Sequence, residues 1–174
     1  MKRPPPRMAA LVVAGLQSAL LLGVAGQLLL ERALSPRGWA RTEPVDPSLP
    51  IRGRYVTLRL VVPAAATTPA CRLLARRRQV RPVWLGVRDG RVVASSVGSG
   101  GNPRPARLTE GADGAAAHLR QPLAFFVPPG VKDPSRRGPG EELWAEVTLP
   151  AEGPPRPIRL GVKRGDRIEP LALR

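Results

Sequence analysis

The residue types that usually carry catalysis are scarce in this chain and are not spaced for it. His118 is the one histidine in 174 residues, and it lies within a run of small and polar residues where we expect a solvated loop. A nucleophile–base–acid triad needs a histidine held between a hydroxyl and a carboxylate, which such a loop does not provide. We therefore predict that the protein is not an enzyme and has no catalytic residues.

A membrane-tethered hydrolase of the signal-peptidase type is the alternative. Such an enzyme pairs a serine just after a membrane anchor with a lysine on a strand. Lys163 is placed for a strand, but no local motif joins it to a serine. The candidate nucleophiles are Ser35, Ser48, Ser95 and Ser96.

Metal and cofactor chemistry finds equally little support. Cys71 is the single cysteine, so we expect no internal disulfide, and one cysteine with one histidine cannot form a structural zinc site of the usual kind. No glycine-rich phosphate loop leads from a strand into a helix. We predict no metal and no cofactor, and we expect Cys71 to be a buried apolar thiol, with an intermolecular disulfide as the alternative.

The element that most constrains the chain is an uncharged stretch from Met8 to Leu30, MAALVVAGLQSALLLGVAGQLLL. A helix rises about 1.5 Å per residue, so this stretch reaches about 34 Å, enough for a hydrocarbon core of about 30 Å. Gly23-Val24-Ala25 resembles a signal-peptide cleavage site, but the apolar part of a signal peptide usually has only about 7–15 residues. We predict a basic tail over residues 1–7 and a transmembrane helix over residues 8–34, ending at Ser35-Pro36.

Flanking charges orient this helix only weakly. Three basic residues lie within the first seven positions, and three more (Arg32, Arg37 and Arg41) follow the stretch, so the two flanks tie. The free amino group and the density of positive charge favour a cytoplasmic tail. We predict a single-pass protein of the cytoplasmic membrane with the residues after about 35 on the extracytoplasmic side.

The formal charge of +15 bears on partners. Only three of the 28 basic residues are lysine, and the many arginines accompany 22 prolines and 18 glycines, a joint bias typical of a GC-rich genome. The run Arg76-Arg77-Arg78 has no interleaved aromatic residues on which bases could stack, so we predict no nucleic-acid partner. We expect these arginines to lie on a solvated face of the protein, with contact to anionic lipid headgroups as the alternative.

Beyond the helix, the apolar residues change to a period of two. Residues 35–50 contain four prolines and are predicted to form a linker or arm, while residues 51–174 suffice for one domain. Asp89-Gly90 predicts a tight hairpin turn, and residues 98–118 are expected to form a long loop. Strands are predicted near 54–62, 83–88, 91–97, 123–127, 143–149, 158–162 and 168–173. The predicted fold is mainly β, an antiparallel β-sandwich or partly open barrel.

One constellation is more specific. The chain has Asp46-Pro47, then Arg52-Gly53-Arg54-Tyr55 leading to Leu58 and Leu60, and later Phe126-Val127-Pro128-Pro129-Gly130. This order resembles the GDYXXLXY family of membrane-anchored bacterial proteins of unknown function, over roughly residues 8–63 and 121–163. Members typically have an amino-terminal membrane helix, an Asp-Pro arm, the motif strand and a Phe-Val-Pro-Glu-Gly segment. The matching positions are Asp46, Pro47, Arg52, Gly53, Tyr55, Leu58, Phe126, Val127, Pro128 and Gly130.

Three positions depart from this pattern. Arg54 replaces the motif aspartate, Leu60 the final tyrosine and Pro129 the expected glutamate. Leu60 keeps an apolar group beside Leu58, but the other two changes remove carboxylates, which puts any role of those acids in doubt for this chain. The resemblance implies mainly structural roles for the matched residues, with binding at the Tyr55 face as the alternative.

The resemblance also implies a partner, because members are often encoded beside polytopic membrane proteins. Together with the predicted anchor, it indicates a single-pass bacterial protein whose periplasmic β-rich domain is a non-enzymatic accessory or binding module for a membrane protein. The alternatives are the tethered hydrolase and a basic domain that binds anionic lipid headgroups. The sequence identifies no small-molecule ligand.

Overall fold

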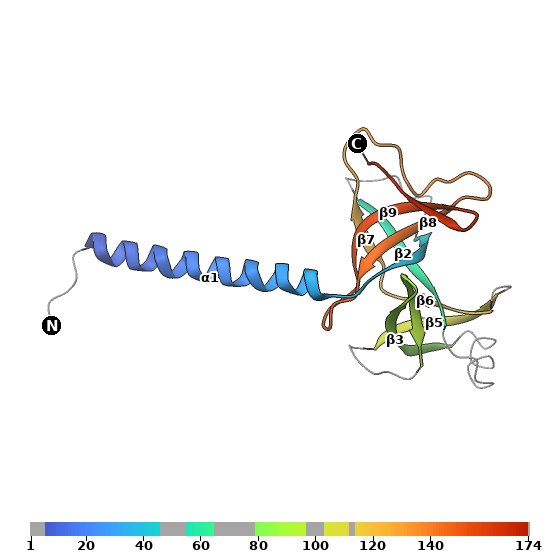
Figure 1. Ribbon diagram of the computed structural model, residues 1–174, viewed down its shortest axis with the longest axis horizontal. Coiled ribbons are helices and arrows are strands. Elements are labelled where there is room, and N and C mark those ends of the chain that lie inside the picture. Colours follow the sequence, from blue (N-terminus) through green and yellow to red (C-terminus); the bar gives the residue numbers. More distant parts are fainter. Residues whose placement is uncertain (1–5, 46–54, 65–78, 97–102, 112–113, 174) are drawn as a thin grey trace. The chain divides into compact units, whose positions relative to one another are not determined.

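The computed structural model describes residues 6–45, 55–64, 79–96, 103–111 and 114–173. The chain divides into two compact units, residues 1–35 and 36–174. The first unit contains helix α1 (Pro6–Leu34), drawn in blue in Figure 1. The last helical hydrogen bond runs from the N–H of Ser35 to the carbonyl oxygen of Glu31 at 2.9 Å, and the hydroxyl of Ser35 donates to the same oxygen at 2.6 Å. Pro36 has no N–H to continue the series, so the helix ends here.

The surface of α1 is apolar and uncovered. Residues Ala10–Leu34 are long and apolar enough to cross a membrane, and none of that span is buried in protein. Its leucine and valine side chains are 50–74% exposed. Apolar surface in water costs about 25 cal/mol per Å², so this helix requires an apolar environment. Such a helix is found both in membrane anchors and in signal sequences.

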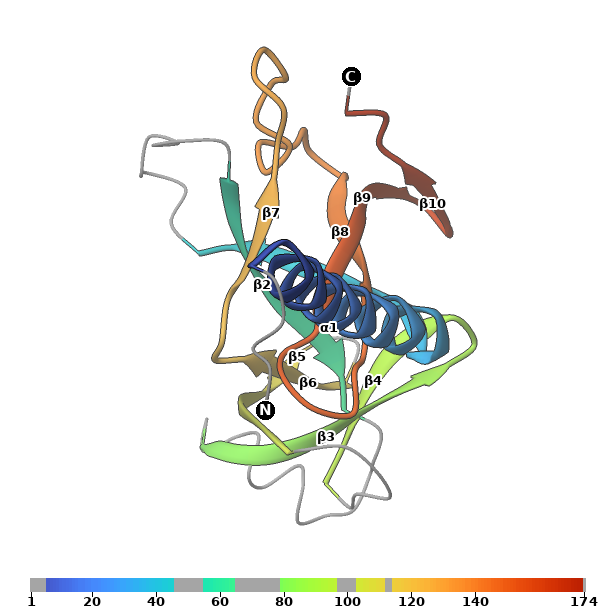
Figure 2. The same ribbon diagram turned by 90° about the vertical axis from the view of Figure 1, so that its left-hand side faces the viewer.

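The second unit is built on a closed six-stranded barrel (Figures 1 and 2). Its strands follow the order β1-β4-β3-β5-β6-β2, and pairing of β2 with β1 closes the ring. All these pairs are antiparallel except β1 with β4, which run parallel and meet at Trp39 and Arg91. The strands are β1 (Arg37–Pro44), β2 (Tyr55–Pro63), β3 (Val80–Arg88), β4 (Arg91–Ser95), β5 (Arg104–Gly111) and β6 (Gly114–Leu119). The mainly β fold is thus confirmed, and its form is a mixed barrel.

Four further strands extend the barrel on two sides. β7 (Leu123–Phe126) follows β6 and pairs with the first half of β2, whose second half pairs with β6. On the other side, β8 (Glu142–Thr148) pairs with β1 and is followed in the sheet by β9 (Arg156–Arg164) and β10 (Arg167–Pro170).

Alternating residues of these strands form one core. The strand predicted near 54–62 is β2, and its alternate residues Val56, Leu58, Leu60 and Val62 are buried, with exposures of 0–5%. The other strands contribute Ala40, Val83, Val92, Ala94, Ala106, Leu108, Ala117, Leu119, Leu123, Leu143, Ala145, Val147 and Leu160. The hairpin prediction is also confirmed. Asp89 and Gly90 have φ of 51° and 70°, as the tight primed turn between β3 and β4 requires.

Two predictions of irregular structure are wrong. Within the expected linker 35–50, residues 37–44 form β1, which pairs with β2, β4 and β8. Within the expected loop 98–118, residues 104–111 form β5 and residues 114–118 belong to β6. The physical reason is shared. The inward residues of β1 are Gly38, Ala40 and Thr42, and those of β5 and β6 are alanines with one leucine in each strand, so few of the large apolar residues by which strands are recognised are present.

An ion-pair cluster joins the β9–β10 hairpin to the start of β8. The Nε and Nη2 groups of Arg164 donate to Glu141 Oε1 at 2.9 and 2.8 Å, and Nη1 donates to Glu169 Oε2 at 3.1 Å. Hydrogen bonding from Arg164 holds the pKa of Glu141 below its ordinary value of 4.5. The side chains of Arg164 and Glu169 are largely exposed and that of Glu141 is partly exposed, so solvent screens these pairs and the cluster orients the hairpin more than it stabilises the fold.

Gly161 marks the tightest packing on this side of the sheet. A Cβ atom at Gly161 would lie 2.8 Å from Trp39 Cζ3 and 3.0 Å from the backbone oxygen of Glu169. The backbone oxygen belongs to the paired strand β10 and cannot move aside independently. Only a residue without a side chain therefore lets the Trp39 ring lie against β9.

We predict that Gly161→Ala lowers the free energy of unfolding by about 1–3 kcal/mol, because the added methyl group overpacks this contact. Gly86→Ala is the matched control, since Gly86 is also within a strand but has nothing within 4 Å of its Cβ position. The control should leave stability unchanged or raise it by about 0.4–1 kcal/mol. Urea denaturation of the detergent-solubilised chain measures both, and equal effects would contradict this account of Gly161.

Candidate functional site

The structure brings together the two segments singled out by the resemblance. β2 and β7 pair antiparallel, with Tyr55 opposite Phe126 and Leu58 opposite Leu123. Four matched residues (Asp46, Pro47, Arg52 and Gly53) and Arg54 lie outside the described residues. The motif strand and the Phe-Val-Pro segment are therefore neighbours in space, although about 70 residues separate them along the chain.

The described motif residues divide between core and surface. Leu58 and Val127 are 1% and 5% exposed, and Leu60, which replaces the motif tyrosine, is fully buried. Tyr55 and Phe126 are 59% and 46% exposed, and their rings pack edge to face with centroids 5.7 Å apart. Pro128 is half-buried, and Gly130 has a φ of +86°, which favours glycine. The motif thus supplies core packing and one exposed aromatic pair.

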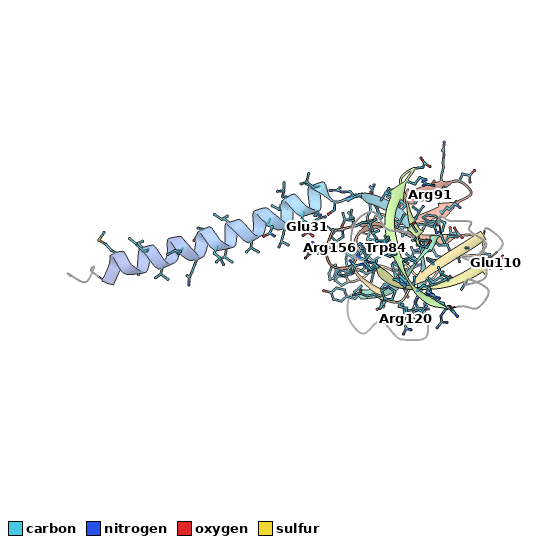
Figure 3. The ribbon with its side chains drawn as sticks, turned by 90° about the horizontal axis from the view of Figure 1, so that it is seen from below. Glu31, Trp84, Arg91, Glu110, Arg120 and Arg156 are labelled. Carbon is cyan, nitrogen blue, oxygen red and sulfur yellow. The ribbon has the colours of Figure 1, made fainter. Side chains whose placement is uncertain are left out.

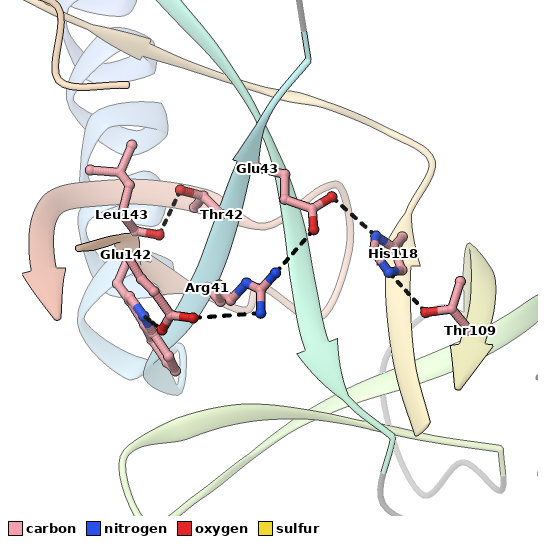
Figure 4. A network of polar contacts seen from close by, with 8 residues as sticks. Arg41, Thr42, Glu43, Thr109, His118, Glu142 and Leu143 are labelled. Carbon is pink, nitrogen blue, oxygen red and sulfur yellow. Dashed lines mark hydrogen bonds and ion pairs between the residues drawn. The ribbon is translucent and has the colours of Figure 1, made fainter. Parts of the chain in front are cut away.

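A polar cluster on the outer face of the barrel wall contains His118 (Figure 4). His118 Nδ1 lies 3.3 Å from Glu43 Oε2, and His118 Nε2 lies 3.0 Å from Thr109 Oγ1. Arg41 bridges Glu43 at 3.3 Å and Glu142 at 3.5 Å. The expectation of a solvated loop histidine is wrong, because His118 is half-buried on β6 and is held from β1 and β5.

The order hydroxyl, imidazole, carboxylate in this cluster is that of a catalytic triad. A carboxylate only accepts hydrogen bonds, so Glu43 selects the tautomer of neutral His118 that carries its proton on Nδ1. Nε2 then accepts from the hydroxyl of Thr109, as the base of a triad does. Glu43 is also bound by Arg41, and Thr109 pairs with Ala116 in the β5–β6 ladder.

An open pocket of about 270 Å³ lies beside His118. It is formed by β2, β5, β6 and the residue after β6, and its lining residues are Arg59, Arg107, Thr109, His118, Leu119 and Arg120. The arginines stand on the outer faces of their strands, and Arg120 is at the surface (Figure 3). The Nε atom of Arg59 is buried and has no hydrogen-bond partner among the described residues. A buried donor left unpaired costs about 1–3 kcal/mol.

The pocket and the cluster escaped sequence reasoning because their members are far apart in the chain. Glu43, Arg59 and His118 come from three strands, two of which lay in segments expected to be irregular. A period-two pattern over residues 104–119, read with alanine as an inward residue, is the signal that would have placed them. Within the described ranges, no group of three histidine, cysteine, aspartate or glutamate side chains is arranged to hold a metal ion.

The residues considered for a serine–lysine dyad have other interactions. Lys163 Nζ lies 3.9 Å from Glu142 Oε2 and above the ring of Trp144, and Ser35 donates to the helix backbone. Ser95 is a residue of β4 and pairs with Trp84 of β3. Ser48, Cys71 and the run Arg76-Arg77-Arg78 lie outside the described residues.

Comparison of the chain with protein-family models, with curated proteins and with solved structures finds no match. The site is therefore interpreted from its own geometry.

Proposed function

We propose that this chain is a single-pass membrane protein whose barrel domain is a non-enzymatic accessory or binding module for a polytopic membrane protein. The observation that carries the proposal is the exposed apolar helix, uncovered over Ala10–Leu34, in a chain whose barrel has its own buried core. The barrel does not need the helix to complete that core. The helix is thus available to hold the domain at a membrane.

Length supports an uncleaved anchor over a signal peptide. The span of 25 residues exceeds the apolar stretch of about 7–15 residues that signal peptides usually have. The basic residues at the amino end favour a cytoplasmic tail and a periplasmic barrel.

The aromatic pair Tyr55–Phe126 is the surface proposed to contact the partner. Both rings are large and about half exposed, and they lie on β7 and β2, where the sheet order ends. Aromatic residues are enriched at the centres of protein interfaces because they bury large area with few rotatable bonds. The resemblance to GDYXXLXY proteins supports the same surface, since both rings occupy positions of that pattern.

The orientation is tested by fusing a reporter that is active only outside the cytoplasm after Arg174. Activity is expected in cells expressing the full chain, because the predicted topology exports residues after about 35. A cytoplasm-active reporter at the same position serves as the matched control. Strong cytoplasmic activity with intact expression would refute the periplasmic placement.

The partner is tested by affinity purification of the full chain from its native membranes in mild detergent. We expect a polytopic membrane protein to co-purify with the wild type, and its recovery to fall at least fivefold with Tyr55→Ala/Phe126→Ala. Val80→Ala, which truncates another exposed apolar side chain, is the control and should retain the partner. Equal recovery with all three chains would remove the aromatic pair from the interface, and recovery of no membrane protein would remove the partner.

The order Thr109–His118–Glu43 favours a second candidate function, a membrane-tethered hydrolase with Thr109 as nucleophile in place of a serine. Arginines that line the pocket would lie near negative charge that develops on a substrate. A threonine within a strand ladder is a less accessible nucleophile, so the binding module remains the leading proposal.

A fluorophosphonate probe separates these functions. If the chain is a binding module, the folded protein will not be labelled, and Thr109→Val will have no effect on the result. Labelling that is lost in both Thr109→Val and His118→Ala would establish the hydrolase instead. Heat-denatured protein provides the background signal.

A further inference from the structure

Three arginines meet at the pocket on the barrel wall, although they are distant in sequence. Arg59 comes from β2, Arg107 from β5 and Arg120 from the residue after β6, and the alternation of each strand turns these side chains outward. None of the described residues that line the pocket is a carboxylate. The pocket therefore concentrates positive charge at one place on the domain.

The fold does not neutralise these three guanidinium groups. Elsewhere on the barrel, Arg159 pairs with Glu146 and Arg164 with Glu141. Among the residues that the structure describes, Arg59, Arg107 and Arg120 have no ion-pair partner. Arg88 and Arg167 also lack an ion pair within the described part of the chain, so the distinctive feature is that three such guanidinium groups line one pocket. Their charge is available to a ligand.

The carboxylate opposite Arg59 is engaged by other residues. Glu43 stands directly opposite Arg59 in the β1–β2 ladder, where a cross-strand ion pair would be expected. Its two oxygens instead contact His118 and Arg41. Arg59 keeps a buried Nε donor without an acceptor among the described residues.

We propose that this pocket binds a phosphate group through Arg59, Arg107 and Arg120. Guanidinium groups bind phosphate oxygens in pairs of parallel hydrogen bonds, and a tetrahedral phosphate offers more acceptor directions to three arginines than a planar carboxylate does. The pocket is slightly smaller than the range of about 300–1,000 Å³ typical of small-molecule sites, which suits a small anion or a single headgroup. The phosphate belongs to a free phosphate compound or to a lipid headgroup.

This inference goes beyond the partner proposal and does not depend on it. Phosphate binding is measured on the purified chain alone, so failure to find a protein partner leaves it intact. Conversely, failure to bind phosphate would leave the Tyr55–Phe126 surface unaffected.

The test is calorimetric titration of the full chain in a non-ionic detergent at fixed ionic strength. One arm uses inorganic phosphate, and the other uses a short-chain phosphatidic acid below its micelle concentration. The pocket variant is Arg107→Gln/Arg120→Gln, which changes two exposed residues and is expected to fold normally. The matched control is Arg88→Gln/Arg167→Gln, two exposed arginines at the ends of β3 and β10 that lose the same charge.

The pocket variant should weaken binding at least tenfold, and the control less than twofold. Binding of inorganic phosphate with this pattern identifies a free phosphate compound as the source, while binding of the lipid alone with this pattern identifies the headgroup. Binding of neither ligand by the wild type, or equal weakening in both variants, would overturn the proposal. Arg59→Gln provides an independent variant, and thermal melts confirm that each protein is folded.

Discussion

The barrel depends on the close approach of β1 to its neighbours. β1 pairs with β8 through Arg37–Arg41, with β2 through Arg41–Pro44 and in parallel with β4 at Trp39. Closing a sheet of short strands requires the chain to pass near other backbones, and small residues allow it. At Gly38 a Cβ atom would already lie 3.2 Å from the backbone of Arg91 and from two valine side chains. β1 also pairs with β8, so the strand that closes the barrel is the strand that carries the β8–β10 extension.

The outer face of β1 determines the chemistry of the barrel wall. Inward positions of the strand are small and buried, and the alternation places Arg41 and Glu43 outside. Glu43 contacts His118 of β6, and Arg41 forms an ion pair with Glu142, the first residue of β8. Because this one carboxylate is used for His118 and Arg41, the arginine opposite it is left to the pocket. A structural strand and the proposed phosphate site are thus coupled through a single side chain.

Sequence reasoning succeeded where large apolar residues alternate. Strand β2 and the Asp89-Gly90 turn were predicted because valine, leucine and a turn dipeptide carry strong local signals. It failed for β1, whose inward residues are glycine, alanine and threonine, and for β5 and β6, which each have one inward leucine among alanines. Such strands are stabilised by pairing and close packing with neighbours, which local patterns do not report. The triad-like cluster and the pocket were missed with them, since Glu43, Thr109, Arg107 and His118 all lie on these strands.

The sequence by itself determined the apolar helix, the mainly β class of the remaining chain and most of the strands with large core residues, because hydrophobic burial acts through residue type and period. Only the tertiary structure decided that the sheet closes into a mixed barrel. It also decided that Tyr55 meets Phe126, and that three arginines far apart in the sequence meet beside His118. These outcomes depend on strand order and register between segments far apart in the chain, and the energies that select them exist only once the strands are paired.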